Sequence, residues 1–169
     1  MKTTVSFLGI TLLSVSLTYS PYSIAQQCSP NGSSSTPTQR FTDHGDGTIS
    51  DQESGLMWKK CLEGQEGSQC LGKPALSSWS LATQQASTNH FAGYTGWRLP
   101  TLAELKSIVE KQCSYPAANL NIFPGTPSAG LWSSDNDDTN NAWSLDFSKG
   151  SAFSVMKAGG KYMRLVRDI

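Results

Sequence analysis

Ten consecutive residues, 96–105, constrain the fold more than any other part of the chain, and they read Gly-Trp-Arg-Leu-Pro-Thr-Leu-Ala-Glu-Leu. Pro100 keeps the residue before it out of helical geometry. Thr101 can then cap a helix, and Glu104 is spaced to complete a capping box with it. Apolar residues follow at helical spacing. The sequence therefore predicts a helix from residue 102 to about residue 111, entered through a rigid turn.

Strands and loops are predicted on both sides of this helix. Residues 41–58 are predicted to form a hairpin, and residues 61–75 a loop because glycine and proline recur there. A first helix is predicted over residues 78–89, capped by one of the two serines at its start. Residues 131–167 alternate as strands do and are predicted to form one meander. The predicted fold class is α+β, with two helices packed on a twisted, mainly antiparallel sheet and long irregular loops.

The first 25 residues have the pattern of a secretory signal peptide. Lys2 supplies the positive start, an apolar run follows, and Ser23-Ile24-Ala25 places small residues before a cut. Polar residues interrupt the run, which is shorter than the ~20 apolar residues that a membrane span needs. We therefore expect cleavage after Ala25, export to the periplasm or the exterior, and no membrane span in the rest of the chain.

Composition limits what the exported chain can bind. Without Lys2, it carries 12 basic and 13 acidic residues, and such a near-neutral balance gives no general attraction to nucleic acid. Residues 26–39 are rich in Ser, Thr, Pro and Gly and are predicted to be a flexible arm. Residues 40–169 are then predicted to form one domain.

Four cysteines lie beyond the signal peptide, at positions 28, 61, 70 and 113. An even number in an exported chain indicates disulfides, and four cysteines allow three pairings. We favour Cys61–Cys70, which closes a short polar loop, and by elimination Cys28–Cys113. A zinc site is the alternative, but the spacing lacks the paired Cys-x-x-Cys motif.

Four sequence blocks carry a resemblance to a known family: Arg-Phe-Thr-Asp from 40 with Gly-Asp-Gly-Thr from 45, Gly-Leu-Met-Trp from 55, Trp-Arg-Leu-Pro-Thr from 97 with Glu-Leu from 104, and Leu-Trp-Ser-Ser from 131 with Ala-Trp-Ser-Leu-Asp-Phe from 142. Over residues 40–167 the chain resembles the Lcl C-terminal domain family, named after a bacterial collagen-like adhesin. The helix block also resembles the formylglycine-generating (sulfatase-modifying) superfamily. Both resemblances imply a C-type-lectin-like fold, which does not by itself fix a ligand.

Catalysis is not expected. The formylglycine-generating enzymes use two cysteines late in the domain, and this chain has no cysteine after Cys113. The two histidines, His44 and His90, do not lie in a nucleophile motif. We therefore predict no catalytic residue, with an uncharacterised enzyme of the sulfatase-modifying superfamily as the less favoured alternative.

An acidic loop is the candidate for a metal ion. Asp135, Asp137 and Asp138 are close in sequence, and such oxygen ligands can hold calcium. The favoured interpretation is a hairpin loop whose side chains cap their own backbone, since no second acidic segment completes a calcium shell. No cofactor is predicted other than this possible calcium.

Basic residues near the C-terminus are the candidate ligand site. Together with an exposed tryptophan beside the acidic loop, they could hold a sulfated or carboxylated polysaccharide; the predicted residues are Trp132, Lys149, Lys157, Lys161 and Arg164. Ordinary surface charge is the alternative, with Arg164 or Arg167 paired to Asp146 or Asp168.

The resemblance and these residues together predict an exported, non-catalytic recognition domain. By resemblance to the adhesin domain, it would bind anionic, sulfated glycans. A protein-interaction or assembly module of the cell surface is the alternative, with a surface protein as partner. The sequence leaves the oligomeric state open.

Overall fold

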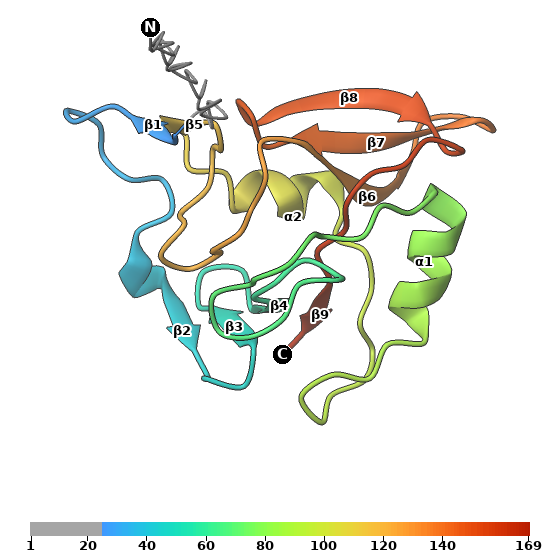
Figure 1. The fold of residues 1–169 in the computed structure, drawn as a ribbon, viewed down its shortest axis with the longest axis horizontal. Helices are drawn as coiled ribbons and strands as arrows, with labels where there is room; N and C mark the ends of the chain where they lie inside the picture. The colour runs from blue at the N-terminus through green and yellow to red at the C-terminus, as the bar shows by residue number, and fades with distance from the viewer. Residues whose placement is uncertain (1–24) are drawn as a thin grey trace, which may run out of the picture.

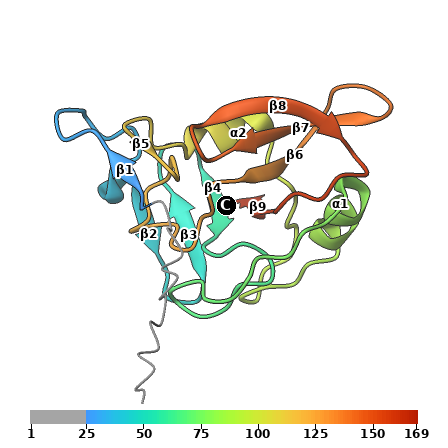
Figure 2. The same cartoon turned by 45° about the horizontal axis from the view of Figure 1, so that its top comes forward.

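The computed structural model describes residues 25–169, and Figures 1 and 2 show it from two directions. It is an α+β structure in which two helices accompany three separate antiparallel sheets. The predicted fold class is thereby confirmed, although the single sheet that we expected is divided. The predicted signal peptide, apart from Ala25, lies outside the described residues. Among the described residues, none of the helices has the length and apolar character needed to cross a bilayer.

Two larger sheets and one small sheet carry the architecture. The four-stranded sheet has the order β2-β3-β4-β9, with β2 at Phe41–Asp43, β3 at Thr48–Asp51, β4 at Leu56–Lys59 and β9 at Val166–Asp168. The three-stranded sheet has the order β6-β7-β8, with β6 at Gly130–Asn136, β7 at Asn141–Asp146 and β8 at Ser151–Met156. The small sheet pairs β1 (Gln27–Cys28) with β5 (Cys113–Ser114). Helix α1 spans Trp79–Ser87, helix α2 spans Leu102–Ser107, and a 3-10 turn, η1, spans Thr38–Arg40.

The last strand joins the first sheet and not the C-terminal one. The prediction that residues 162–167 close the C-terminal meander holds only at Tyr162, which forms a parallel bridge with Leu131. It was wrong for the rest of the segment, because β9 pairs with β4, with Val166 opposite Trp58. Val166 also exchanges two backbone hydrogen bonds with Arg98, at 2.9 and 3.0 Å. The β9 segment thus pairs with β4 along one edge, and Val166 forms hydrogen bonds to Arg98 along the other edge. Figure 2 shows β9 beside β4, below the sheet formed by β6, β7 and β8.

The predicted hairpin over residues 41–58 is a three-stranded meander. A second turn follows β3, where the Gly55 N–H donates to the Asp51 carbonyl at 3.0 Å. The Asp51 carboxylate is buried and accepts hydrogen bonds from the Arg40 guanidinium. β4 therefore lies inside the sheet, between β3 and β9.

Helix α2 begins as its sequence predicts and ends early. The capping box is present: Thr101 Oγ1 accepts from the Glu104 N–H at 3.2 Å, and Glu104 Oε2 accepts from the Thr101 N–H at 2.7 Å. The helix ends at Ser107 and not at residue 111. The chain leaves the helix four residues before the predicted end. Beyond the helix, the Glu110 N–H donates to the Ala117 carbonyl at 3.1 Å.

Helix α1 is shorter than predicted and lacks the expected cap. It occupies residues 79–87, and the Ser78 side chain makes no capping hydrogen bond. The Ser77 hydroxyl instead donates to Gln85 Oε1 at 3.2 Å. The helix is held by burial of Ala82 and Ala86 against the core.

Trp132 is a core residue, which corrects the prediction that it is partly exposed. Its side chain is 0% exposed, and its indole Nε1 donates to the Ser77 carbonyl at 2.7 Å. Its strand neighbours Leu131 and Ser133 are buried as well. β6 is thus covered on both faces, so Trp132 cannot contact a ligand at the surface.

Both predicted disulfides are present, Cys28–Cys113 and Cys61–Cys70. The first ties residues 26–39 to the domain, and the predicted flexible arm does not fit the contacts found there. Gln26 Nε2 donates to the carbonyls of Pro116 and Ala118 at 2.8 and 2.7 Å. The arm is therefore attached to the domain at Gln26, at Cys28 and at residues 34–36.

Glu110 is the main anchor of the arm. Its carboxylate is 3% exposed and accepts hydrogen bonds from the hydroxyl groups of Ser34, Ser35 and Thr36 and from two of their backbone amides. Burial alone raises the pKa of Glu110, but the hydrogen bonds from Ser34, Ser35 and Thr36 outweigh it and lower the pKa to about 2. The anchor is thus an ionised carboxylate surrounded by donors.

We expect Glu110→Gln to lower the free energy of unfolding by about 2 kcal/mol at pH 7. The charge-assisted hydrogen bonds become neutral ones, and the glutamine amide N–H points at groups that are themselves donors. The pKa of Glu110 is lowered from 4.5 to about 2, so its contribution is present above pH 4.5 and lost as pH falls toward 2. Urea unfolding of both proteins at pH 7, 4 and 2 measures this. A difference between them that does not shrink below pH 4.5 would contradict the assignment.

Candidate functional site

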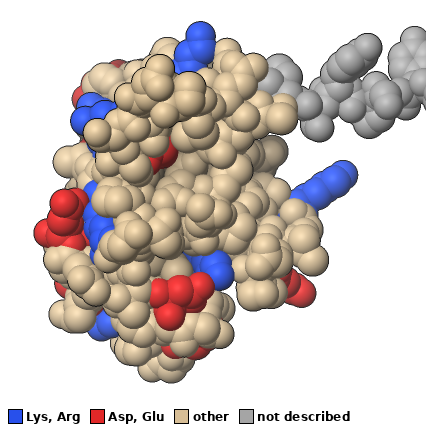
Figure 3. All heavy atoms as spheres, turned by 90° about the vertical axis from the view of Figure 1, so that its left-hand side faces the viewer, with Lys and Arg blue, Asp and Glu red and all other residues tan. Residues whose placement is uncertain are grey.

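The predicted basic site does not assemble. Lys149 precedes β8 and Lys157 follows it, so the two lysines lie at opposite ends of a six-residue strand. Lys157 Nζ donates to the carbonyls of Asp138 and Thr139 at 2.8 and 3.1 Å. Lys161 is half-buried. On the face shown in Figure 3, basic side chains appear as separate spots among acidic and uncharged ones.

Arg164 is buried, which corrects its assignment to a surface that binds anions. Its side chain is 1% exposed, and burial lowers its pKa to about 9, still above neutral pH. It donates to the carbonyls of Lys59 and Lys60 and, at 2.8 Å, to Thr126 Oγ1. The guanidinium also lies over the Phe123 ring, 4.6 Å from its centroid. Arg164 therefore serves the interior of the protein.

The acidic loop uses its carboxylates on the protein itself. Asp135 Oδ2 accepts from the Leu102 N–H at the start of α2, at 2.8 Å. Asp137 Oδ2 accepts from the Ser154 hydroxyl at 2.6 Å. Asp138 accepts from its neighbouring backbone amides, as in a capped turn. Within residues 25–169, no three acidic, His or Cys side chains gather in a way that could hold a metal ion.

One histidine lies within hydrogen-bond distance of a serine. His44 Nε2 and Ser50 Oγ are 2.7 Å apart across the β2–β3 hairpin. The histidine is exposed, and among the described residues no carboxylate accepts a hydrogen bond from its ring. The pair lacks the third member that orients the base in nucleophilic catalysis.

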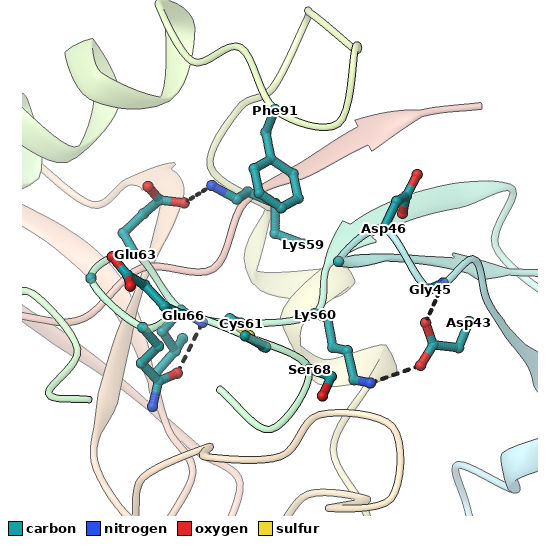
Figure 4. Close-up of a pocket in the computed structure, with 15 residues that line it drawn as sticks. Asp43, Gly45, Asp46, Lys59, Lys60, Cys61, Glu63, Glu66, Ser68 and Phe91 are labelled. Atoms are coloured by element: carbon teal, nitrogen blue, oxygen red, sulfur yellow. Dashed lines mark hydrogen bonds and ion pairs between the residues drawn. The ribbon is translucent and has the colours of Figure 1, made fainter. Parts of the chain in front are cut away.

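A pocket of about 470 Å³ lies where the β2–β3 turn meets the end of β4, and Figure 4 shows it. We call it the Phe91 pocket; it is lined by Asp43, residues 45–47, residues 59–68 and Phe91. The Cys61–Cys70 disulfide closes the loop that forms one of its walls. Its size falls in the range of small-molecule sites.

One side of the pocket is an ion pair stacked on an aromatic ring. Lys59 Nζ contacts Glu63 Oε1 and lies 4.2 Å from the centroid of the Phe91 ring. Gly47 supports that ring, since a Cβ at this position would lie 2.7 Å from it. Lys59 is thereby held by both a charge and a ring.

The other side holds a second ion pair. Lys60 Nζ lies 2.7 Å from Asp43 Oδ2, across the pocket from Glu63 in Figure 4. Burial raises the pKa of Asp43, but the hydrogen bonds from Lys60 and from the Gly45 N–H outweigh it and lower that pKa. The Lys59 and Lys60 side chains are only 10% and 11% exposed, so their charges are largely committed to these partners.

Two more carboxylates line the pocket without a cation. Asp46 Oδ1 accepts from the Thr48 hydroxyl and N–H, and the Thr48 hydroxyl is the main cause that lowers the pKa of Asp46. Asp46 and Glu66 are exposed, and within residues 25–169 neither forms a salt bridge. Four carboxylates and two ammonium groups therefore line the pocket, which leaves it net negative.

Arg164 explains how two consecutive lysines line one pocket. In a regular strand, neighbouring side chains and carbonyls point in opposite directions. Lys59 and Lys60 depart from this alternation, because the carbonyls of both residues accept a hydrogen bond from Arg164 Nη1. The chain therefore turns at the end of β4, and both ammonium groups reach the same cavity.

The sequence analysis did not identify this pocket as a site. It predicted the Gly45-Asp46-Gly47 turn and the disulfide loop as separate features, and nothing in the sequence shows that they meet. Two consecutive lysines where an apolar strand passes into a loop were the one available signal, since binding residues concentrate on loops that a rigid scaffold positions.

Comparison with known proteins identifies one family. A family model described as the Lcl C-terminal domain matches residues 47–167. The match spans both helices and all residues of the Phe91 pocket from Gly47 onward. No curated protein matches the chain.

Proposed function

This chain belongs to the Lcl C-terminal domain family, and from that premise we propose that it is an exported, non-catalytic recognition domain that binds a saccharide in the Phe91 pocket. The observation that carries the proposal is the make-up of this pocket: an aromatic ring and a disulfide between two fixed ion pairs. Ligand sites typically combine an apolar lining with a few well-placed polar groups.

The charges of the pocket favour a ligand with hydroxyl and amino groups. Asp46 and Glu66 are free to accept hydrogen bonds or to pair with a ligand cation, whereas the two lysines already have partners. A sulfated glycan would meet a net negative rim and be repelled. An amino sugar would be attracted. The separation of Lys149, Lys157 and Arg164 also speaks against the anionic ligand that the resemblance implies.

Two further features support export and a non-catalytic role. Two disulfides, with no free cysteine among the described residues, are typical of proteins from oxidising compartments. Of the lining residues with a nucleophilic group, Cys61 is in a disulfide, and no hydrogen bond joins Ser68 to the unpaired carboxylates Asp46 and Glu66. A nucleophile in contact with its general base is typical of covalent catalysis, whereas fixed ion pairs suit recognition.

We expect the double change Asp46→Asn and Glu66→Gln to weaken binding of a glucosamine tetrasaccharide by about twofold to thirtyfold, since each exposed ion pair contributes about 0.2–1 kcal/mol. The measurement is isothermal titration calorimetry of the purified chain at about 50 and about 300 mM salt. The higher salt screens the part of the binding free energy that comes from charges. Glutamine and asparagine keep the size of each side chain.

The matched control is Glu53→Gln with Asp137→Asn, which removes the same two charges from the surface outside the pocket. It should bind as the unchanged protein does. Heparin tetrasaccharide should bind more weakly than the glucosamine oligomer, and calcium or chelator should change neither. Tighter heparin binding would overturn the ligand class, and shortened oligomers after incubation would overturn the non-catalytic role.

A further inference from the structure

A second cavity adjoins the Phe91 pocket. It has a volume of about 480 Å³ and lies between the disulfide loop and the C-terminal end of α1. We call it the Met163 pocket; its lining includes Ala75, Gln85, Asn89 and Met163. Glu63 and Gly64 line both cavities, so the two share a wall.

The shared wall is formed by Glu63 and by the backbone of Gly64. A Cβ on Gly64 would lie 2.8 Å from the Ala75 nitrogen, so the chain at Ala75 packs directly against this glycine. The Glu63 carboxylate is drawn to Lys59 over the Phe91 ring, as Figure 4 shows. A ligand that extends from one cavity to the other would pass over the backbone of Gly64, where no side chain projects.

One stretch of chain serves both cavities. Asn89 and His90 line the Met163 pocket, and the next residue, Phe91, lines its neighbour. The Phe91 N–H and carbonyl are fixed by backbone hydrogen bonds to Tyr94, at 3.1 and 2.9 Å. The spacing between the two cavities is thus set by a rigid turn and not by a loose loop.

Asn89 carries a polar atom that lacks a partner. Its Oδ1 is buried, and no group among residues 25–169 donates a hydrogen bond to it. An unsatisfied buried acceptor costs free energy, so its presence in a cavity wall calls for a donor. The terminal torsion of asparagine is broad, which lets the amide turn toward the cavity. Hydroxyl and amino groups are suitable donors.

We propose that the two cavities form one groove for a linear oligosaccharide, with one sugar unit in the Phe91 pocket and the next in the Met163 pocket. This inference rests on the proposed function and adds to it that the ligand is a chain of at least two linked units. The charged side chains at the first cavity select amino groups, and Asn89 and Gln85 at the second contact hydroxyl groups. The link between the units passes over Gly64.

The test is a length series with glucosamine, its β-1,4-linked dimer and its tetramer, measured by calorimetry. For the unchanged protein, the dimer should bind at least about tenfold more tightly than the monomer, because the second contact is made within one molecule. The double variant Gln85→Ala and Asn89→Ala should keep the monomer affinity and lose most of this gain. Removing Asn89 Oδ1 leaves no donor unpaired. Gln85→Ala removes the acceptor of the Ser77 hydroxyl, a loss of about 1–3 kcal/mol that the fold should survive.

Ser80→Ala is the matched control, because Ser80 is exposed on α1 and lines neither cavity. It should retain the full gain. If Gln85→Ala with Asn89→Ala does not fold, His90→Ala tests the same cavity. Equal affinities for monomer and dimer would overturn the groove and leave the single-pocket function standing. A failure of all three probes to bind the unchanged protein would overturn both.

Discussion

Arg164→Met is expected to lower the free energy of unfolding by about 3 kcal/mol at pH 7. The guanidinium donates to the carbonyls of Lys59 and Lys60 and to Thr126, and methionine leaves these three acceptors buried without a donor. Each orphaned acceptor costs about 1–3 kcal/mol. Relief from burying a cation, whose pKa is lowered to about 9 by desolvation, offsets part of this loss.

Guanidinium chloride unfolding measures the change, and Arg167→Met is the control. The Arg167 guanidinium donates to the Thr95 carbonyl at 3.1 Å and, weakly, to the Met57 sulfur at 3.9 Å, and it packs on the Tyr94 ring. Its replacement should cost less than about 1 kcal/mol. Equal losses from the two variants would show that Arg164 does not organise the end of β4.

Removal of the long disulfide is the second large effect. Cys28→Ser with Cys113→Ser should lower the free energy of unfolding by about 4 kcal/mol, because this bridge joins residues that are 85 positions apart. Such a cross-link restricts the unfolded chain more strongly as the closed loop lengthens. Urea unfolding without reductant provides the measurement.

The short disulfide is the internal comparison. Cys61 and Cys70 are 9 positions apart, so Cys61→Ser with Cys70→Ser should cost about 2–3 kcal/mol. The two variants should also differ in kind. Loss of the long bridge leaves the arm held by hydrogen bonds alone, those of Glu110, of Gln26 and of the β1–β5 pair. Loss of the short bridge loosens a wall of the Phe91 pocket. A smaller cost for the long bridge would contradict the chain-entropy account.

Local sequence patterns predicted the local structure well. The capping box of Thr101 and Glu104, the start of α2 and both disulfides are present as expected. Each of these depends on residues that are close in sequence or on a small number of cysteines. Helix ends were less predictable, because α2 ends at Ser107 where tertiary hydrogen bonds of Glu110 take over from helical ones.

Features that depend on distant segments were not predictable. Arg164 looked like a surface charge, since arginine is rarely buried. Only three carbonyl and hydroxyl acceptors from two other segments make its burial possible. Trp132 was misplaced for a similar reason, because the alternation of one strand cannot show that both of its faces are covered. The Phe91 pocket likewise unites three segments that no pattern links.

The pairing of β4 with β9 imposes an order on folding. The central strand of the N-terminal sheet, at Leu56–Lys59, receives its last neighbour only from residues 166–168. Contacts between such distant segments close a long loop and slow the folding reaction. During synthesis, the first sheet and the buried Arg164 site stay incomplete until residues 164–168 have emerged. The native N-terminal sheet can therefore form only when two segments more than a hundred residues apart are both present to pair.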